Sequence, residues 1–541
     1  MTAWNFADVW ETAAERVPDA PAVVQGGHST TWASFDRRAD GVARTLLDHG
    51  VQRATSVALY LYNCPQYLEV AFGAMKIGLA PVNTNYRYGD DELAYLWDNA
   101  DAAAVAFHGV FTERVERLRR RLHAVRLWLW VDDGSGPRPE WAVDYEQAAT
   151  AADQRVHAPW GRSGDDLLLL YTGGTTGTPK GVMWRQDDLF CRLNRGNLVR
   201  VDEEGGLDAV RAVIGGPGPA LLPACPLMHG TGMFTSIGVL NVGGRVVLLQ
   251  GRHFDPLELF DTVDAEQVNV VTIVGDAFAR PMLAALDEHP GRFKLDSLIG
   301  MISSGVMWSE ETKQGLLRHL PSVLLIDAFS SSEALGMGTS VSSASETRRT
   351  ATFSLGPDVR VIDVDSGRDV EPGSGVSGLL ALGGRNPIGY YKDPDKSAAT
   401  FRTIDGQRFS VPGDFATVEA DGTIRLLGRG SVCINTGGER VFPEEVEEVL
   451  KRHPAVRDAV AVALPDSTFV EVVAAVVELH PGGSATEAEL RDHVRASLAA
   501  YKAPKRVMFV DTIGRSPSGK VDYARHRRDV AQWAGAGVGA G

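Results

Sequence analysis

Cysteine is scarce in this sequence, and its placement excludes two kinds of cross-link. The 541 residues include 4 cysteines. They are widely separated and contain no C-x-x-C pair: Cys64, Cys191, Cys225 and Cys433. The pattern indicates neither a disulfide framework nor a zinc site, and it is typical of a protein kept in a reducing compartment.

Long apolar runs and a positive net charge are also missing. No segment approaches the ~20 consecutive apolar residues of a membrane-spanning helix, and residues 1–8 lack both a basic start and an apolar stretch. The formal net charge of −15 argues against a nucleic-acid partner. The basic cluster at 114–121 has helical spacing and is expected to be a solvated helix face. We therefore expect a cytoplasmic protein.

What the sequence does have is enough apolar material for a large core. Hydrophobic residues make up 44% of the chain, more than one domain usually needs. Strand-like and helix-like segments alternate, which predicts an α/β fold with stacked parallel sheets covered by helices on both faces. Among the expected strands are 56–60, 166–170, 245–249, 268–274, 298–302 and 323–326.

The pattern of predicted secondary structure changes from about residue 360. Short strand-like pieces separated by Gly, Pro and Asp turn signals predict an antiparallel or barrel-like subdomain, which completes a large N-terminal domain over residues 1–430. A compact α+β pattern then predicts a small C-terminal domain over residues 431–530. The tail, residues 531–541, is rich in Gly and Ala and is expected to be disordered.

The stretch from Tyr171 to Val182 reads YTGGTTGTPKGV and follows the apolar run 166–170. Its glycines offer backbone N–H groups without side-chain bulk, its threonines offer hydroxyls, and Lys180 adds a cation, which together suit a triphosphate. A turn without function is the simpler alternative. A P-loop is excluded because Pro179 and Gly181 stand where that motif needs a glycine and a hydroxyl.

This stretch closely resembles the phosphate loop of the adenylate-forming superfamily, which includes acyl-CoA synthetases, peptide-synthetase adenylation domains and firefly luciferase. The resemblance extends from about Phe6 to Arg528, with further motifs in the family order. Gly173 stands where the family usually has serine, which removes one hydroxyl. The ATP contacts implied here are Thr172, Gly173, Gly174, Thr175, Thr176, Gly177 and Lys180.

The segment 326–333 resembles the family's Tyr-Gly-x-Thr-Glu element. A Ser-rich loop with one Glu is more often only a loop, but this one follows the phosphate stretch and a predicted strand. The resemblance implies that Phe329 stacks on adenine, that Ser332 and Ser330 bind ATP, and that Glu333 is catalytic and holds Mg²⁺. Backbone contacts to adenine are implied for Ser304 and Gly305, although the sequence of this segment departs from the usual sequence of the family.

Two further positions are implied for the ribose, Asp414 in a Gly-Asp pair and Arg429 in a Gly-Arg pair. The carboxylate of Asp414 can accept hydrogen bonds from both ribose hydroxyls. Each pair is weak alone, because Asp after Gly is commonly just a turn. Their order in the chain matches that of the family.

The catalytic cation implied by the resemblance is Lys520, in a segment similar to the family's C-terminal lysine motif. A carboxylate must attack an already negative α-phosphate, and an ammonium between them offsets the repulsion in the transition state. A lone lysine near a terminus is normally a solvated charge. The flanking Pro-Ser-Gly favours the catalytic role of Lys520 over that alternative.

The same resemblance implies which positions serve the second step. Gly437 and Gly438 are expected to line a tunnel for the pantetheine arm of coenzyme A, and Pro443 is expected to begin a helix. The C-terminal domain is expected to be mobile, with its hinge at Ser431, because two half-reactions need different groups at one site.

The segment 226–232 resembles the family's segment that opens the acyl pocket, which implies an aromatic gate at His229. Met233 and Phe234 are expected to line the pocket beyond it. Gly275 and Ala277 follow a predicted strand and leave volume open. Asp276 between them is expected to face solvent or to pair, since an isolated charge in an apolar pocket is costly. Metal binding by the isolated His229 is a weaker alternative.

The resemblance implies an acyl-CoA synthetase of the actinobacterial fatty-acyl type, some members of which act on steroid side chains. Its substrates would be a hydrophobic carboxylic acid, ATP with Mg²⁺, and coenzyme A, and a homodimer is an open possibility. Two alternatives remain: an adenylating enzyme that loads a carrier protein, and a luciferase-like oxygenase.

Overall fold

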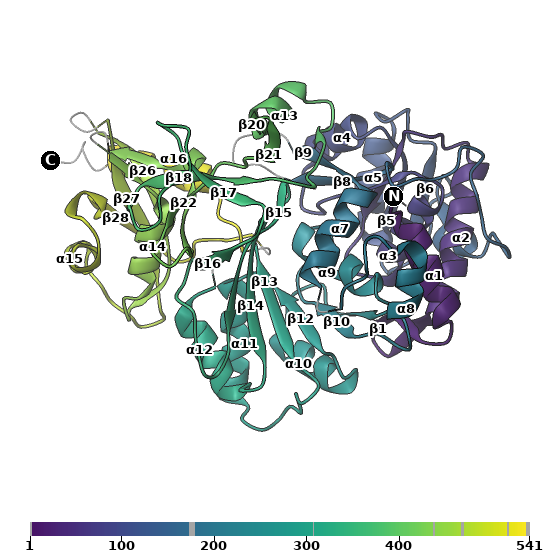
Figure 1. The fold of residues 1–541 in the computed structure, drawn as a ribbon, viewed down its shortest axis with the longest axis horizontal. Coiled ribbons are helices and arrows are strands. Elements are labelled where there is room, and N and C mark those ends of the chain that lie inside the picture. The colour runs from purple at the N-terminus through teal and green to yellow at the C-terminus, as the bar shows by residue number, and fades with distance from the viewer. Residues whose placement is uncertain are drawn as a thin grey trace. The chain divides into compact units, whose positions relative to one another are not determined.

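The computed structural model describes residues 3–172, 179–197, 199–306, 308–436, 439–466, 470–516 and 519–536. The chain forms two compact units. The first consists of the described residues up to Thr350 together with Leu382–Ser410. The second consists of Ala351–Ala381 and the described residues from Val411 onward. Figure 1 labels the elements along the chain.

The first unit contains a largely parallel sheet with the strand order β2-β1-β11-β10-β12-β13-β14-β15. Strands β1 to β14 of this order pair in parallel, whereas β2 and β15 pair antiparallel at its two ends. Its strands are β1 (Pro21–Gln25), β2 (His28–Thr31), β10 (Ala220–Pro223), β11 (Arg245–Leu248), β12 (Val270–Ile273), β13 (Gly300–Ser304), β14 (Leu324–Ser331) and β15 (Ala334–Ser342).

A second sheet of this unit has the strand order β19-β9-β8-β4-β3-β5-β6-β7. The six strands β8-β4-β3-β5-β6-β7 pair in parallel with their neighbours. Strand β9 pairs antiparallel with both β8 and β19. Its strands are β3 (Ser56–Tyr60), β4 (Ala80–Asn83), β5 (Ala102–His108), β6 (Leu127–Val131), β7 (Val143–Asp144), β8 (Leu167–Thr172), β9 (Lys180–Arg185) and β19 (Gly389–Tyr390).

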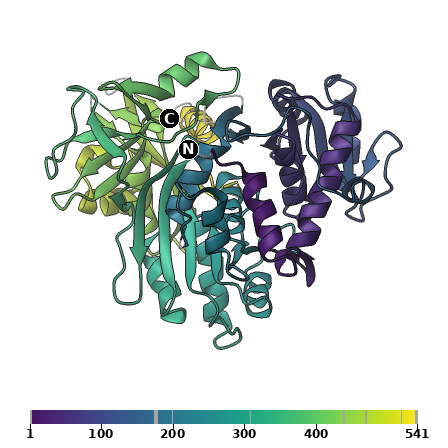
Figure 2. The same ribbon diagram turned by 45° about the vertical axis from the view of Figure 1, so that its right-hand side comes forward.

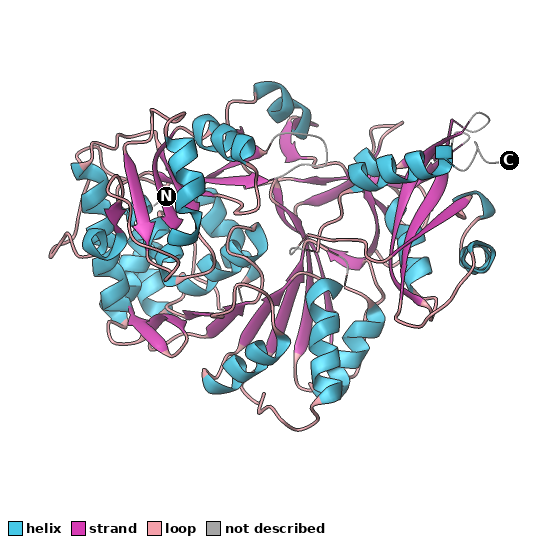
Figure 3. Cartoon of the chain, turned by 180° about the vertical axis from the view of Figure 1, so that it is seen from behind, coloured by secondary structure: helices cyan, strands magenta, loops and turns pink. Residues whose placement is uncertain are grey.

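Helices cover these sheets, as the alternating pattern predicts (Figure 3). Helices α2 and α3 pack side by side (Figure 2). One apolar cluster joins side chains of both sheets through α1, α2, α3, α7 and α9. The helices are α1 (Phe6–Arg16), α2 (Trp32–Asp48), α3 (Pro65–Lys76), α4 (Asp90–Asn99), α5 (Thr112–Arg119), α6 (Tyr145–Ala149), α7 (Gln186–Gly196), α8 (Gly206–Val213), α9 (Gly230–Leu240), α10 (Pro256–Ala265), α11 (Asp276–Glu288), α12 (Glu310–His319) and α13 (Pro394–Thr400).

Local sequence explains where several of these helices begin. The side chain of Asn5 accepts a hydrogen bond from the Ala7 N–H at the start of α1, and Thr31 caps α2 through the Ser34 N–H. Pro65 stands in the first turn of α3, where its missing N–H costs nothing. A short hairpin, β20 (Phe401–Ile404) and β21 (Gln407–Ser410), completes the first unit.

The second unit begins with the predicted antiparallel subdomain. Its strands follow the order β16-β23-β22-β18, with β17 paired to β18, and the resolved pairings are antiparallel. They are β16 (Thr352–Leu355), β17 (Val359–Asp363), β18 (Ser377–Leu382), β22 (Asp414–Val418) and β23 (Ile424–Arg429).

The remainder of the second unit is the predicted α+β region. Its sheet has the order β25-β24-β27-β26, with β28 parallel to β27. Helices α14 and α15 cover one face and α16 packs on the other. The elements are β24 (Ile434–Thr436), β25 (Glu439–Val441), α14 (Pro443–Lys451), β26 (Val456–Asp466), β27 (Val470–Leu479), α15 (Glu487–Ser497), β28 (Arg506–Val510) and α16 (Tyr523–Ala536).

Two sequence expectations need correction. Residues 531–536 of the tail expected to be disordered are helical, because α16 is held by the buried Val530 and by Trp533, whose ring lies under the Arg506 guanidinium at 4.8 Å. The strand expected to end at Ile326 continues to Ser331, because β14 forms a hairpin with β15. Residues 537–541 lie outside the described part of the chain.

Candidate active site

The carboxyl ends of β12 and β13 meet the start of α9 in the first unit. After β12, the Gly275 N–H donates to the Ser303 hydroxyl of β13 at 2.9 Å. Gly305 follows β13 with φ +94°, a conformation that favours glycine. A Cβ built on Gly305 would lie 3.8 Å from the Thr231 hydroxyl oxygen and 3.8 Å from Val274 Cγ1. The segments predicted to contact adenine and the acyl group are therefore neighbours.

The segment predicted to bind ATP around residues 329–332 is part of the β14–β15 hairpin. Phe329 stands opposite Gly338 in that pairing. The Ser330 hydroxyl accepts a hydrogen bond from the Gly336 N–H at 3.0 Å. The Ser332 carbonyl accepts one from the Trp184 indole N–H at 3.0 Å. The hairpin and its tie to β9 fix the backbone that carries these side chains.

Glu333 and Lys180 are brought together by a residue that sequence reasoning missed, Tyr390. The Tyr390 hydroxyl donates to Glu333 Oε1 at 2.8 Å. The Lys180 ammonium lies 5.3 Å from the centroid of the Tyr390 ring. Because β19, which carries Tyr390, is only 2 residues long, hydrophobic periodicity could not have revealed it.

The base of the phosphate stretch is an antiparallel hairpin in which Thr172 of β8 pairs with Lys180 of β9. Buried Asn83, a second residue missed from the sequence, donates to the Tyr171 carbonyl at 2.8 Å and to the Met228 carbonyl at 2.6 Å. Asn83 thus ties this hairpin to the segment that holds His229. The predicted contacts Gly173, Gly174, Thr175, Thr176 and Gly177 lie outside the described residues.

The predicted acyl-pocket residues occupy different environments. His229 is half-buried at the N-terminal cap of α9, and Ala277 is exposed. Met233 and Phe234 are 2% and 5% exposed, within the large apolar cluster. These assignments therefore stay predictions. The expectation for Asp276 is confirmed, since its carboxylate pairs with Arg280 at 3.1 Å.

Asp414 and Arg429 stand opposite each other in the second unit, on β22 and β23. The Arg429 Nε lies 3.3 Å from Asp414 Oδ1. The two residues predicted to hold the ribose are thus side by side, and that role stays a prediction. Their backbone is tightly packed, because a Cβ on Gly428 would collide with the Glu444 carboxyl group of α14.

Lys520 is exposed in the second unit, after a segment fixed by Arg515. The Arg515 Nε pairs with Asp458 Oδ2 of β26 at 2.6 Å, and the Lys520 N–H donates to the Ser516 hydroxyl at 3.0 Å. Ser431 lies in a 3₁₀ turn, Gly430–Val432. The predicted tunnel glycines, Gly437 and Gly438, lie outside the described residues.

A buried pair of ionisable side chains, Asp327 and Lys313, lies beneath strands β13 to β15 of the first unit. Asp327 on β14 stands between Ser303 and Ser340 on the neighbouring strands. Burial raises its pKa to about 7, although the positive charge of Lys313 opposes the rise. The Lys313 Nζ lies 3.9 Å from Asp327 Oδ2, and the lysine is only 1% exposed. No sequence motif pointed to this pair.

The donor set fits a magnesium ion that arrives with ATP. Mg²⁺ is usually held by one or two carboxylates together with substrate phosphates. Glu333 offers such a carboxylate beside the cation Lys180. Within the described ranges, no group of three or more His, Cys, Asp and Glu residues could form a dedicated metal cage.

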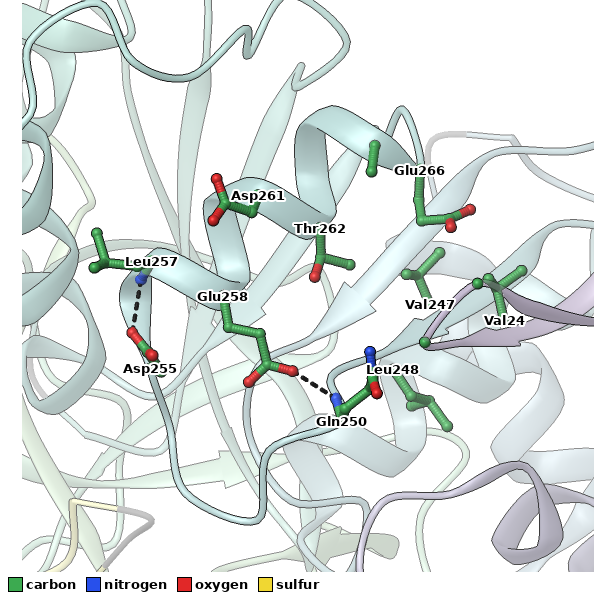
Figure 4. A pocket seen from close by; sticks show the side chains of 13 residues that line it. Val24, Val247, Leu248, Gln250, Asp255, Leu257, Glu258, Asp261, Thr262 and Glu266 are labelled. Atoms are coloured by element: carbon green, nitrogen blue, oxygen red, sulfur yellow. Dashed lines mark hydrogen bonds between the residues drawn. The ribbon is translucent and has the colours of Figure 1, made fainter.

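A separate pocket of about 550 Å³ lies beside β11 and α10 in the first unit (Figure 4). Several carboxylates face it, but that of Glu258 already accepts the Gln250 N–H at 2.6 Å and the Gly251 N–H at 3.0 Å. None of the predicted site residues lines this pocket. It is therefore not the site described above.

The chain belongs to the family of AMP-binding enzymes, whose model matches residues 10–391. The model for the C-terminal domain of AMP-binding enzymes matches residues 445–520. These matches confirm the superfamily predicted from the motifs. Within the described part of the chain, no helix is long and apolar enough to cross a membrane.

Curated relatives cover nearly the whole chain. The chain is 40% identical to the medium/long-chain-fatty-acid–CoA/3-oxocholest-4-en-26-oate–CoA ligase of Mycobacterium tuberculosis, over 96% of this chain and 95% of that protein. It is 39% identical to the 3-oxocholest-4-en-26-oate–CoA ligase of Rhodococcus rhodochrous, over 96% of this chain and 95% of that protein.

A solved structure confirms the fold class. The anthranilate CoA ligase AuaEII in complex with anthranoyl-AMP matches with a TM-score of 0.83 at 22% identity, over 99% of each chain. At this identity the likeness concerns the fold alone.

Proposed function

We propose that this protein is an AMP-forming acyl-CoA ligase for hydrophobic carboxylic acids, either medium- to long-chain fatty acids or steroid side-chain acids. The names of the relatives from Mycobacterium tuberculosis and Rhodococcus rhodochrous support this reaction and this substrate class. The prediction from the motifs agrees with them, because it named both kinds of acid.

The observation that carries the proposal is the cluster of Lys180, Glu333 and Tyr390 at the base of the phosphate hairpin. One cation and one carboxylate contact a single tyrosine, the cation at its ring face and the carboxylate at its hydroxyl. Thr172 adds a hydroxyl at the strand end opposite Lys180. A bound Mg²⁺, held by Glu333, would neutralise part of the phosphate charge.

In the first half-reaction, a carboxylate oxygen of the acid attacks the α-phosphorus of ATP and the bond to pyrophosphate breaks. Lys180 holds the leaving phosphates, and Asp414 with Arg429 holds the ribose. Lys520 supplies the ammonium that offsets repulsion between the two anions. Phe329 stacks on adenine, and the acid lies beyond His229.

In the second half-reaction, the thiol of coenzyme A attacks the acyl carbon, and AMP leaves with the electron pair of the broken mixed-anhydride bond. We propose that residues 431–530 turn about Ser431 between the two steps. The thiol arm would then enter past Gly437 and Gly438, because glycine has no side chain to hinder a narrow arm.

The test is pyrophosphate release over a panel of acetate, octanoate, palmitate, benzoate and a steroid side-chain acid, followed by mass spectrometry of the product. We expect the highest kcat/KM for acids of eight or more carbons and a CoA thioester as the product. Preference for acetate would overturn the substrate class. An acyl-AMP that coenzyme A leaves intact would instead favour a carrier-protein acceptor, and light or oxygen uptake would favour an oxygenase.

A further inference from the structure

We propose that Tyr390 is a positioning residue that holds Glu333 and Lys180 ready for magnesium and triphosphate while keeping the two charges apart. The inference rests on the proposed function, because it assumes that these two residues meet MgATP. It assigns a role to a side chain outside the motifs that suggested the activity.

The backbone of Tyr390 is fixed beside Lys180. Strand β19 pairs antiparallel with β9, and Tyr390 stands opposite Val182. The Tyr390 N–H donates to the Ser397 hydroxyl at 2.8 Å, and the next residue, Tyr391, donates its N–H to the Gly181 carbonyl at 2.7 Å. The side chain is 5% exposed. A ring held this firmly offers its hydroxyl and its face in fixed directions.

The hydroxyl of Tyr390 orients the Glu333 carboxylate without using both oxygens. It donates to Oε1 at 2.8 Å, whereas Oε2 has no hydrogen bond within the described part of the chain. The carboxylate also sits on a fixed backbone, because the Glu333 carbonyl accepts the Ser410 hydroxyl at 2.7 Å. Glu333 is therefore oriented with an oxygen left to bind a cation.

The ring of Tyr390 holds the Lys180 ammonium by its face, at 5.3 Å from the centroid. No carboxylate of the described residues lies within ion-pair distance of Lys180 Nζ. Attraction by a ring face is weaker than a direct ion pair, so the ammonium keeps its charge for an incoming phosphate. If Lys180 and Glu333 paired directly, each would neutralise the other, and both would have to separate before MgATP could bind.

The two functions of the tyrosine can be separated by substitution. Tyr390→Phe keeps the ring between the charges and removes only the hydroxyl. Tyr390→Leu removes both the hydroxyl and the aromatic face that holds the Lys180 ammonium. Tyr391→Phe is a matched control, because the Tyr391 hydroxyl also donates to a carboxylate, Asp101 Oδ2, at 2.8 Å.

The experiment measures equilibrium binding of ATP to each full-length variant by calorimetry, first without metal and then with increasing Mg²⁺. We expect Tyr390→Phe to raise the half-saturating Mg²⁺ concentration about tenfold and to leave metal-free ATP binding unchanged, as for loss of one hydrogen bond to a charged group. Tyr390→Leu should also weaken metal-free ATP binding about tenfold. Tyr391→Phe should match the wild type.

Equal loss of ATP affinity with and without metal in Tyr390→Phe would overturn the proposal, as would unchanged Mg²⁺ dependence. Conversion of a supplied acyl-AMP to thioester should stay at the wild-type rate in Tyr390→Phe, which shows that the variant is folded. If the wild type itself neither bound ATP nor released pyrophosphate, the proposed function would fail, and the role of Tyr390 would fail with it.

Discussion

Two lysines carry the proposed cationic roles, and the structure holds them in different ways. Lys180 begins a sheet strand in the first unit and lies over a buried ring. Lys520 is exposed in the second unit, and its segment is tied down through Arg515. A group that binds phosphates suits a rigid sheet. A group that is needed in just one step suits a separate unit, because such a unit could move away from the substrate before the other step.

The largest effect that would sharpen this comparison comes from Lys520→Ala. Because the ammonium is needed only where two anions meet, acyl-AMP formation should fall about 10³-fold. A supplied acyl-AMP should still be converted to thioester. Rapid-quench measurement of each half-reaction tests this, with Lys505→Ala as a control for loss of one exposed lysine. Equal losses in both steps would break the comparison.

Ser431→Pro should give the next largest effect. Gly430 donates its N–H to the Gly413 carbonyl at 3.0 Å, and a Cβ on Gly430 would meet the Phe415 ring at 2.6 Å. Glycine is thus required here for close packing, and proline at 431 further restricts the turn. We expect thioester formation to fall about 10²-fold while adenylation survives. Unchanged thioester formation would place the pivot elsewhere.

A smaller effect is expected on the pH dependence of the free energy of unfolding, and it arises from Asp327 in the first unit. Burial raises the pKa of Asp327 to about 7, so the folded state binds a proton more tightly than the unfolded state. This contribution is complete below about pH 4, and the free energy of unfolding falls by at most ~1.4 kcal/mol per pH unit as pH rises towards 7. Denaturant titrations of Asp327→Asn should lose this slope, whereas the exposed Asp19→Asn should keep it.

The smallest effect is expected for Ser431→Asp. The turn needs only backbone freedom at this position, so a carboxylate should change either half-reaction by less than about threefold, the scale of a surface charge. Rapid-quench measurement of each half-reaction separately is the test. A change above tenfold in one step would mean that charge at 431 selects between orientations.

Much of the fold followed from local patterns. Strand 56–60 coincides with β3, and strand 245–249 agrees with β11 to within one residue. The ribose candidates Asp414 and Arg429 were chosen from two weak motifs, and the β22–β23 register sets them opposite each other. These features depend on neighbouring residues or on one hairpin, so their signals are present in a short window of sequence.

Other features needed the whole chain to fold. Tyr390 meets Glu333 across 57 positions, and Asn83 meets Tyr171 across 88. The tail was misjudged from composition, because the contact that orders it comes from Arg506 on β28. None of these pairings leaves a periodic pattern.

The sequence by itself determined the family, the reaction class and the strands that carry the residues predicted to bind phosphate and ribose, because motifs and periodicity are local. Only the tertiary structure decided how Lys180 and Glu333 are kept apart by one buried tyrosine, and that Asp327 lies buried beside Lys313. The physical reason is that burial and charge proximity depend on distances in space, which chain neighbours do not encode.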